Sequence, residues 1–486
     1  MRKAAMAAAS VLVAACSASA ATKMMFFFDT EDFTCNESND AIVETANILA
    51  DEGVVGEYAV VGYLAREIVR NRRQDVIDAL SKHHVGTQSL GHSVHPTICE
   101  LSDKRDFREA YRLVAAAESE GNGMLKAAFG LQNVDFAVPP GNSFSYVAMY
   151  AYADLGVKFY AAGGFTDYHK DWTDYGSNGV VRRDNIGLGL WYCNLYQVPY
   201  NWIMTLEDLI PGNRTPPPDI DAKLDEMSKR DLIAIFMHPN MAIKTQQWDG
   251  VNYARTNLSE YGSWVQVPSR PKEVVDQFYR NFRAFVRRVK GDSRFEITNL
   301  RELEASLKPR VPITRGDVHA IRAAMLRDFG PIHEPASWSV ADVFQAVTLF
   351  LRDQSAAEHR PGIVRGFLER PAGVRAPVEV TVQELRQAAA GIDLGWFVPR
   401  EIELAPGKVI GPADYLFAAL EALDTGAASV TVEPREQLGS FREIPDLEHF
   451  KLRGSIHGGW IIHSPDYRDD FLSDRLRLQL WTMRIE

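Results

Sequence analysis

The chain has 486 residues, of which 46% are hydrophobic, 24% charged and 10% aromatic. This composition excludes a largely disordered protein, and the length predicts about two to four domains. The net charge of −11 at pH 7 argues against a general nucleic-acid binder.

Residues 1–21 have the pattern of a secretory signal peptide. Two basic residues precede an apolar, alanine-rich run that is too short to span a membrane. Cleavage near Ala20 or Ala21 is the preferred interpretation, because a strand is expected to begin at Met24. The alternative is acylation of Cys16, whose surroundings resemble a bacterial lipoprotein box and would supply a lipid anchor. Both interpretations predict an exported protein, periplasmic or secreted.

The mature chain would keep Cys35, Cys99 and Cys193. Three widely spaced cysteines predict neither a disulfide framework nor a zinc–thiolate site. One disulfide is compatible with the sequence, and its pairing is not determined by it.

Residues 23–308 alternate between short apolar runs and longer amphipathic segments. Strands are expected at Met24–Phe28, Tyr58–Gly62, His84–Gln88, Val134–Val138, Val157–Tyr160, Trp191–Val198, Leu232–Met237 and Phe295–Ile297. Helices are expected at Ala41–Asp51, Leu64–Leu80, Phe107–Glu120, Ser145–Leu155, Ile220–Ser228, Lys272–Val289 and Asn299–Leu307. Repeated strand–helix units predict an α/β fold, with a parallel sheet or barrel covered by helices.

Polar residues that could take part in catalysis or metal binding follow four of these strands. They are Asp29 to Asp32, Gln88 to His95, Pro140 to Asn142, and His238. Active sites of α/β barrels are built at the carboxyl ends of the strands. We therefore expect these four segments to meet in one site.

The residue pattern of 311–486 differs from that of residues 23–308 and predicts a smaller, mainly helical domain. Helices are expected at Ser339–Leu351, Val382–Ala390 and Asp414–Leu423. Proline-rich segments follow the first two helices at a similar spacing, which predicts stacked modules of about forty residues. The alternative is two unrelated connections in one helical domain.

Taken together, the motifs resemble those of the polysaccharide deacetylase family, also called NodB homology or carbohydrate esterase family 4. The matching segments are Phe28-Asp29-Thr30-Glu31-Asp32-Phe33, Gln88-Ser89-Leu90-Gly91-His92, Val138-Pro139-Pro140-Gly141 and Ile235-Phe236-Met237-His238. The resemblance covers about residues 23 to 307 and implies a distorted (β/α) barrel. The segments Asp29-Thr30-Glu31-Asp32 and His92-Ser93-Val94-His95-Pro96 are similar to those of an exported bacterial branch of this family. This similarity implies that residues 311–486 form an accessory domain for attachment to wall or glycan.

The resemblance also implies an activity, a cofactor and a set of roles. The protein would be a metal-dependent hydrolase that removes N-acetyl groups from an amino-sugar polymer such as peptidoglycan, with Asp29 as base and His238 as acid. The divalent metal would be zinc, with cobalt, nickel or manganese as alternatives. The roles of the remaining residues are metal binding for Glu31 or Asp32, Gln88 and His92, and substrate binding for His95, Pro140, Gly141 and Asn142.

Two departures from the family pattern keep other functions open. Gln88 stands where the family has its first metal-binding histidine, and a neutral amide is a poorer zinc ligand than imidazole. In addition, no arginine precedes Pro139 to hold the base Asp29. One alternative is a catalytically impaired relative that binds glycan or organises the envelope. Another is a hydrolase of other amide C–N bonds on the same barrel.

Overall fold

A computed structural model describes residues 21–103, 106–142, 145–161, 189–198, 200, 203–253, 263–440, 475 and 477–486. Residues 1–20 of the predicted signal peptide, which include Cys16, lie outside these residues. Within the described residues, no helix is both long enough and apolar enough to cross a membrane. Cys35, Cys99 and Cys193 are buried and none of them forms a disulfide.

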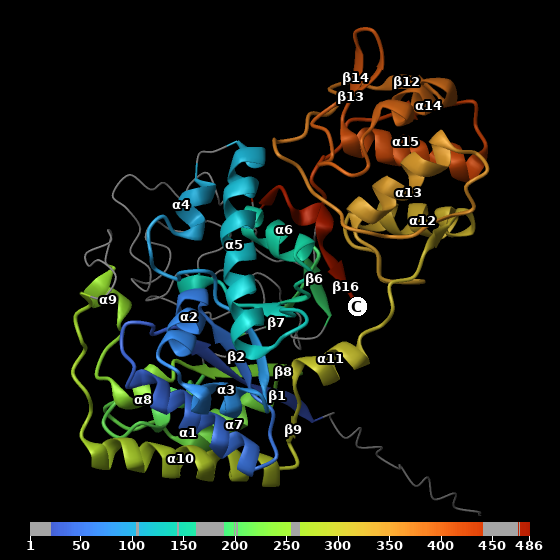
Figure 1. Ribbon diagram of the computed structural model, residues 1–486. Coiled ribbons are helices and arrows are strands. Elements are labelled where there is room, and N and C mark those ends of the chain that lie inside the picture. Colours follow the sequence, from blue (N-terminus) through green and yellow to red (C-terminus); the bar gives the residue numbers. More distant parts are fainter. Residues whose placement is uncertain are drawn as a thin grey trace, which may run out of the picture.

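The described residues up to 307, together with the last described residues of the chain, form a mixed α/β structure around one curled sheet (Figure 1). Hydrogen bonding orders nine of its strands as β16-β6-β7-β5-β4-β3-β2-β1-β8, and β9 pairs with β1. The strands are β1 (Thr22–Thr30), β2 (Glu57–Val60), β3 (His84–Thr87), β4 (Phe136–Ala137), β5 (Phe159–Ala161), β6 (Leu190–Tyr192), β7 (Leu195–Val198), β8 (Leu232–Met237), β9 (Phe295–Ile297) and β16 (Arg484–Ile485). Apart from the antiparallel pairings of β6, all pairs are parallel. A parallel bridge between Tyr200 and Ala234 brings the segment after β7 against β8, so the sheet returns on itself.

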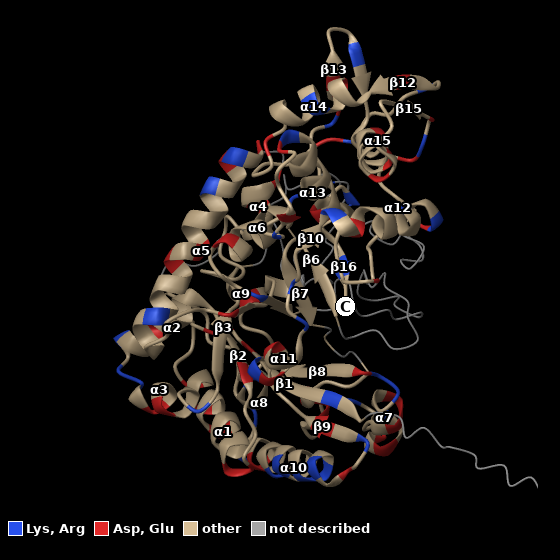
Figure 2. Cartoon of the chain, turned by 90° about the vertical axis from the view of Figure 1, so that its right-hand side faces the viewer, with Lys and Arg blue, Asp and Glu red and all other residues tan. Residues whose placement is uncertain are grey.

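Helices cover the outside of this sheet. They are α1 (Ser38–Asp51), α2 (Gly62–Arg70), α3 (Gln74–Leu80), α4 (Ile98–Ser102), α5 (Phe107–Phe129), α6 (Tyr146–Asp154), α7 (Ile220–Met227), α8 (Asn240–Ile243), α9 (Asp249–Asn252), α10 (Lys272–Gly291) and α11 (Leu300–Ser306). The apolar side of α10 is buried through Phe278, Phe282 and Phe285. Its many basic residues are marked along the helix in Figure 2.

The middle of strand β1, Met24–Phe28, is apolar without interruption because both faces of the strand are buried. Phe26 and Phe28 pack on the helix side, where both contact Phe282 of α10. Met25 and Phe27 belong to the inner core of the curled sheet. Side chains alternate between the faces of a strand, so Asp29 falls on the inner face with Phe27.

Two sequence predictions of single elements are wrong in detail. The helix expected at Leu64–Leu80 is two helices, α2 and α3, separated near Arg72, which has a φ of 56°. The strand expected at Trp191–Val198 is the hairpin β6–β7, which turns at Cys193 and Asn194 with φ values of 48° and 68°. Neither break contains glycine or proline, the residues that normally mark such positions in a sequence.

The C-terminal region contains the three predicted helices as α13 (Val340–Arg352), α14 (Val382–Gly391) and α15 (Pro412–Thr425), preceded by α12 (Val318–Arg327). Small antiparallel pairs lie between and around them: β10 (Ile313–Thr314) with β11 (Glu358–His359), β12 (Val378–Thr381) with β15 (Ser429–Val432), and β13 (Ile402–Ala405) with β14 (Lys408–Ile410). The connections after α13 and α14 differ, and β12 pairs with β15 across the intervening elements. The predicted repeat of modules is therefore not confirmed.

The end of the chain returns to the sheet. Arg484 and Ile485 of β16 pair with Trp191 and Leu190 of β6, and one hydrophobic cluster joins residues of α6 and β6 to α13 and α15. The change in sequence near residues 308–311 marks the start of the C-terminal region, but the last residues belong to the sheet of the first region.

Candidate active site

The carboxyl ends of four strands surround a small cavity in the curled sheet. Its volume is about 20 Å³, which is room for about one water molecule or ion. The lining residues come from the ends of β1, β3, β4 and β8 and from the segment after β7; they are Asp29, Glu31, Gln88, His92, Val138, Pro139, Gly141, Tyr200, Phe236 and His238. The strand ends that we expected to meet do so here.

Asp29 is held in the cavity wall by Tyr200. The Tyr200 hydroxyl donates a hydrogen bond of 2.7 Å to Asp29 Oδ1. The Tyr200 ring is fixed by stacking on Phe236, with ring centroids 4.6 Å apart, and by an edge contact with Phe27. Burial raises the pKa of Asp29 to about 6, although His238 and the Tyr200 hydroxyl act in the opposite direction.

Glu31 and His92 form the centre of the site. His92 Nε2 lies 2.5 Å from Glu31 Oε2, and both side chains are almost fully buried. Burial by itself would raise the pKa of Glu31, but the nearby His92 and His238 outweigh it and lower that pKa. Burial would lower the pKa of His92, but Glu31 outweighs it and raises that pKa.

The other nitrogen of His92 is fixed by a chain of hydrogen bonds. The Ser93 hydroxyl donates to Asp249 Oδ2 at 2.7 Å and lies 2.7 Å from His92 Nδ1. Because the hydroxyl proton points to Asp249, His92 Nδ1 must carry the proton that joins it to Ser93. Nδ1 is therefore a donor, and Nε2 is left to face Glu31 and the cavity. Metal-binding histidines are oriented by partners of this kind.

His238 is oriented in a similar way by Glu207 of the short helix η2 (Leu206–Leu209). Glu207 Oε1 lies 2.7 Å from His238 Nδ1 and also accepts a 3.0 Å hydrogen bond from the His238 backbone N–H. Nε2 then faces the cavity, 3.4 Å from Glu31 Oε1 and 3.8 Å from Asp29 Oδ2. Burial lowers the pKa of His238, but Glu31 and Glu207 outweigh burial and raise it to about 10.

Gln88 supplies an unsatisfied acceptor. Its Oε1 is buried and has no hydrogen-bond partner, and its side chain lines the cavity. An unpaired buried amide oxygen costs about 1–3 kcal/mol, which a ligand in the cavity would recover. Within the described residues, no group of three or more His, Cys, Asp or Glu side chains is arranged to hold a metal ion. A metal site here would therefore consist of Glu31, His92 and the Gln88 amide oxygen.

The loop that carries Gln88 and His92 has an unusual backbone. Ser89 and His92 have φ values of 71° and 52°, in the left-handed region that non-glycine residues rarely adopt. Such strain costs about 1–3 kcal/mol for each residue and clusters at functional sites. The loop is held by backbone hydrogen bonds from Gly62 and Tyr63 of α2 to the carbonyls of Ser89 and Leu90.

Gly121 of α5 allows this loop to approach the helix closely. A Cβ at Gly121 would lie 3.0 Å from Leu90 Cα and 3.2 Å from Leu90 N. We expect Gly121→Ala to push the loop away and to lower the free energy of unfolding by about 1–3 kcal/mol. Gly123→Ala in the same helix is a matched control, because its Cβ would meet nothing within 4 Å. It should raise the free energy of unfolding by up to about 1 kcal/mol, and equal effects in urea denaturation would contradict this role of Gly121.

Glu118 of α5 lies beneath the same loop and predicts a pH dependence of stability. It accepts a 2.7 Å hydrogen bond from the Tyr152 hydroxyl and a longer one from Leu90 N–H. Burial raises the pKa of Glu118 from 4.5 to about 7. The folded protein therefore keeps this proton while the unfolded chain loses it, so stability falls as the pH rises from 4.5 to about 7. The loss is about 3 kcal/mol at about 1.4 kcal/mol per pKa unit.

Glu118→Gln stays neutral and should remove this contribution. Between about pH 5 and pH 8, the variant should gain about 3 kcal/mol of unfolding free energy relative to the native protein. Urea denaturation across this range measures the difference. Glu120→Gln, on the exposed face of the same helix, should keep the native dependence. Parallel curves for the native protein and Glu118→Gln would show that Glu118 does not titrate in this window.

Not all residues that were predicted for the site lie in it. Both oxygens of Asp32 are used by Thr34 and Ser38, and Asp32 does not line the cavity. The ring nitrogens of His95 contact Glu100 and the backbone carbonyl of Tyr253, and His95 also lies outside the lining. The turn η1 (Pro140–Asn142) contributes Gly141 but not Pro140. The side chain of Asn142 is outside the described part of the structure.

Four residues of the site had no role assigned from the sequence: Tyr200, Glu207, Ser93 and Asp249. Ser93 lies in the predicted segment Gln88 to His95, next to His92, but no role was predicted for it. The other three follow β7, lie in η2 or begin α9, and none belongs to a recognisable motif. The absence of an arginine before Pro139 indicated that Asp29 needs another partner, but it did not point to Tyr200.

The sequence matches no protein-family model and no curated protein. Among solved structures, the chain is similar to a putative polysaccharide deacetylase from Mycobacterium smegmatis, with 13% identity and a TM-score of 0.37 over 60% of this chain and 93% of that one. A family 4 carbohydrate esterase pseudoenzyme from Bacillus anthracis has 13% identity and a TM-score of 0.26 over 46% and 57%. A 4-alpha-glucanotransferase from Thermococcus litoralis has 8% identity and a TM-score of 0.39 over 60% of this chain, which spans only 41% of that protein. At these values the comparisons carry no functional argument, and the function is inferred from the cavity itself.

Proposed function

We propose that the protein is a metal-dependent hydrolase that removes N-acetyl groups from an amino-sugar polymer. The observation that carries this proposal is the convergence of Asp29, Glu31, His92 and His238 on a cavity of about 20 Å³, together with the unsatisfied oxygen of Gln88. Hydrolysis of an acetamide needs a base for water, an acid for the departing amine and a charge that stabilises the oxyanion. The cavity offers a candidate for each.

Asp29 is the proposed base. Its Oδ1 is occupied by the Tyr200 hydroxyl, which leaves Oδ2 to accept a proton from a water molecule in the cavity. Tyr200 takes the positioning role that the missing arginine has in the related family. His238 is the proposed acid, because its Nδ1 is fixed on Glu207 and its Nε2 faces the cavity. It would donate its Nε2 proton to the amine as the C–N bond breaks.

Glu31, His92 and Gln88 are the proposed metal ligands. A carboxylate, an imidazole and an amide oxygen suit a divalent cation, and zinc, cobalt, nickel and manganese all accept nitrogen and oxygen ligands. When bound, such an ion acts as a Lewis acid that polarises the acetamide and activates water. In the metal-free protein, the short contact between His92 and Glu31 needs a proton on His92 Nε2. Metal binding should therefore displace that proton.

Metal analysis followed by a deacetylation assay tests the proposal. The purified protein should bind about one divalent ion for each chain, and the loaded protein should release acetate from chitin oligomers or peptidoglycan. Proton release on metal binding, measured by calorimetry in buffers of different ionisation enthalpy, gives a readout that does not depend on activity. A protein that binds no divalent ion and releases no acetate would overturn the proposal.

Gln88 favours a second candidate function, a relative that binds acetylated glycan without turning it over. An amide oxygen holds zinc more weakly than imidazole, and weak metal binding would leave Asp29 and His238 without the charge that the reaction needs. Under this alternative, the protein binds chitin oligomers or peptidoglycan while releasing no acetate at any metal concentration. Export of the protein would place either function at the cell envelope. If Cys16 is acylated, it would also supply a lipid anchor.

A further inference from the structure

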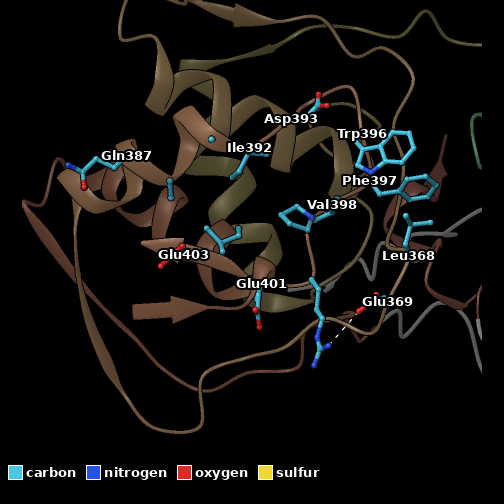
Figure 3. A pocket seen from close by; sticks show the side chains of 15 residues that line it. Leu368, Glu369, Gln387, Ile392, Asp393, Trp396, Phe397, Val398, Glu401 and Glu403 are labelled. Atoms are coloured by element: carbon cyan, nitrogen blue, oxygen red, sulfur yellow. Dashed lines mark ion pairs between the residues drawn. The ribbon is translucent and has the colours of Figure 1, made fainter. Parts of the chain in front are cut away.

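The C-terminal region contains a second pocket, built from residues other than those of the catalytic cavity (Figure 3). Its volume is about 610 Å³, within the range of about 300–1,000 Å³ typical of ligand sites. It lies between the end of α14, the segment that follows it, and β13. We call it the acidic pocket and define it by Ile392 and Val398 of its floor and Glu369, Asp393, Glu401 and Glu403 of its rim.

The floor of the acidic pocket is apolar. Ile392 and Val398 are buried, with exposed fractions of 9% and 7%, and they lie beside the similarly buried Ile402. An apolar floor of this kind favours a ligand with an extended C–H surface over a small hydrated ion. Glu403 of β13 and Glu401, which directly precedes this strand, are exposed, while Ile402 between them is buried.

The rim carries an excess of negative charge. Four carboxylates line it, and the only basic residue among the lining residues is Arg400, whose guanidinium lies 3.5 Å from Glu369. Asp393 accepts a hydrogen bond from the backbone N–H of Gly395, which does not neutralise it. The charges of Asp393, Glu401 and Glu403 therefore remain available to a cationic ligand.

The carboxylates are placed around the floor and do not converge on one point. Figure 3 shows Asp393, Glu369, Glu401 and Glu403 on different sides of Ile392 and Val398. This spacing agrees with the absence, among described residues, of any acidic group arranged to hold a metal ion. Spread charges over an apolar floor fit an organic chain with several separate cationic groups.

The acidic pocket contacts α5, the helix that also supports the loop carrying Gln88 and His92. At the edge of the pocket, the Cζ atom of Arg108 lies 4.0 Å from the centroid of the Trp396 ring. The neighbouring Phe397 packs on Phe107, with ring centroids 4.6 Å apart. Phe107 and Arg108 begin α5, and Glu118 of the same helix contacts Leu90. These contacts join the edge of the acidic pocket to the first turn of α5.

We propose that the acidic pocket binds a deacetylated amino-sugar chain, the cationic product of the proposed reaction. This inference rests on the proposed function, because deacetylation turns each neutral acetamide into an amine that is protonated at neutral or mildly acid pH. The apolar faces of the sugar rings pack on Ile392 and Val398, and the ammonium groups pair with the carboxylates of the rim. The pocket would thus keep the protein on polymer that it has already deacetylated.

Calorimetric titration with glucosamine oligomers, at about pH 6 where amines are protonated, tests this inference. The native protein should bind them, and higher salt should weaken binding because the contacts are ionic. Glu401→Gln with Glu403→Gln should weaken binding about fivefold or more, since it removes two partly screened ion pairs. The matched control is Glu379→Gln with Glu433→Gln, which makes the same charge change at exposed positions of β12 and after β15. The control should bind like the native protein.

The outcomes separate this inference from the proposed function. Equal affinities of the two double variants, no binding by the native protein, or an equal loss of affinity for N-acetylglucosamine oligomers would overturn it. Tighter binding of an oligolysine of matched charge would also overturn it and indicate a basic protein as the partner. Acetate release from a short soluble substrate should be the same for the native protein and for Glu401→Gln with Glu403→Gln. Absence of acetate release by the native protein would count against the proposed function and not against the acidic pocket.

Discussion

Asp29→Asn should reduce the turnover number for acetate release by a factor of about 100 or more, because general-base catalysis contributes about 10²–10⁴. The asparagine keeps an oxygen that can accept the Tyr200 hydrogen bond but cannot take a proton from water. The free energy of unfolding and the content of bound metal should therefore stay close to those of the native protein. The assay is acetate release under saturating metal, with metal content measured on the same preparation.

Asp32→Asn provides the matched comparison three residues away. Asp32 holds the turn after β1 through Thr34 and Ser38, so its substitution should cost about 1 kcal/mol of stability. It should leave the turnover number within about twofold and metal binding unchanged. If Asp32→Asn abolished metal binding while Asp29→Asn retained native turnover, the assignment of the two carboxylates would be wrong.

Gln88→His should increase zinc affinity by about tenfold or more, which corresponds to about 1.4 kcal/mol. The imidazole would replace an amide whose oxygen is buried and unpaired, on a side chain that lines the cavity. It would complete a set of two histidines and one carboxylate with Glu31 and His92. Competition against a chelator of known zinc affinity measures the change.

Gln88→Leu is the control for this substitution, because leucine keeps a similar volume and removes the ligand. It should bind zinc more weakly than the native protein and should also relieve the cost of the unpaired oxygen. Tighter zinc binding in Gln88→Leu, or no gain in Gln88→His, would show that position 88 does not face the metal.

The positions of Asp29, Glu31, Gln88, His92 and His238 followed from local sequence patterns. An apolar run predicts a buried strand, which placed Asp29 to Asp32 at the carboxyl end of β1. The carboxyl ends of parallel strands meet at one end of a barrel, which brought the segments after β3 and β8 to the same place.

The partners of these residues did not follow from local patterns. Tyr200 reaches Asp29 across 171 positions of sequence, and Ser93 reaches Asp249 across 156. Such contacts depend on how the curled sheet closes and on where the segments after β7 and β8 lie. The pairing of β16 with β6 could not be predicted for the same reason, because two short strands far apart in sequence carry no signal that they pair.

The most direct test of the proposed deacetylase is the parallel measurement of acetate and free amine from one acetylated amino-sugar oligomer. The native protein, with its bound metal verified, should form the two products in equal amounts, and Asp29→Asn with the same metal content should form almost none. Equal product formation by both proteins, or no acetate from metal-loaded native protein on chitin oligomers and peptidoglycan, would contradict the account.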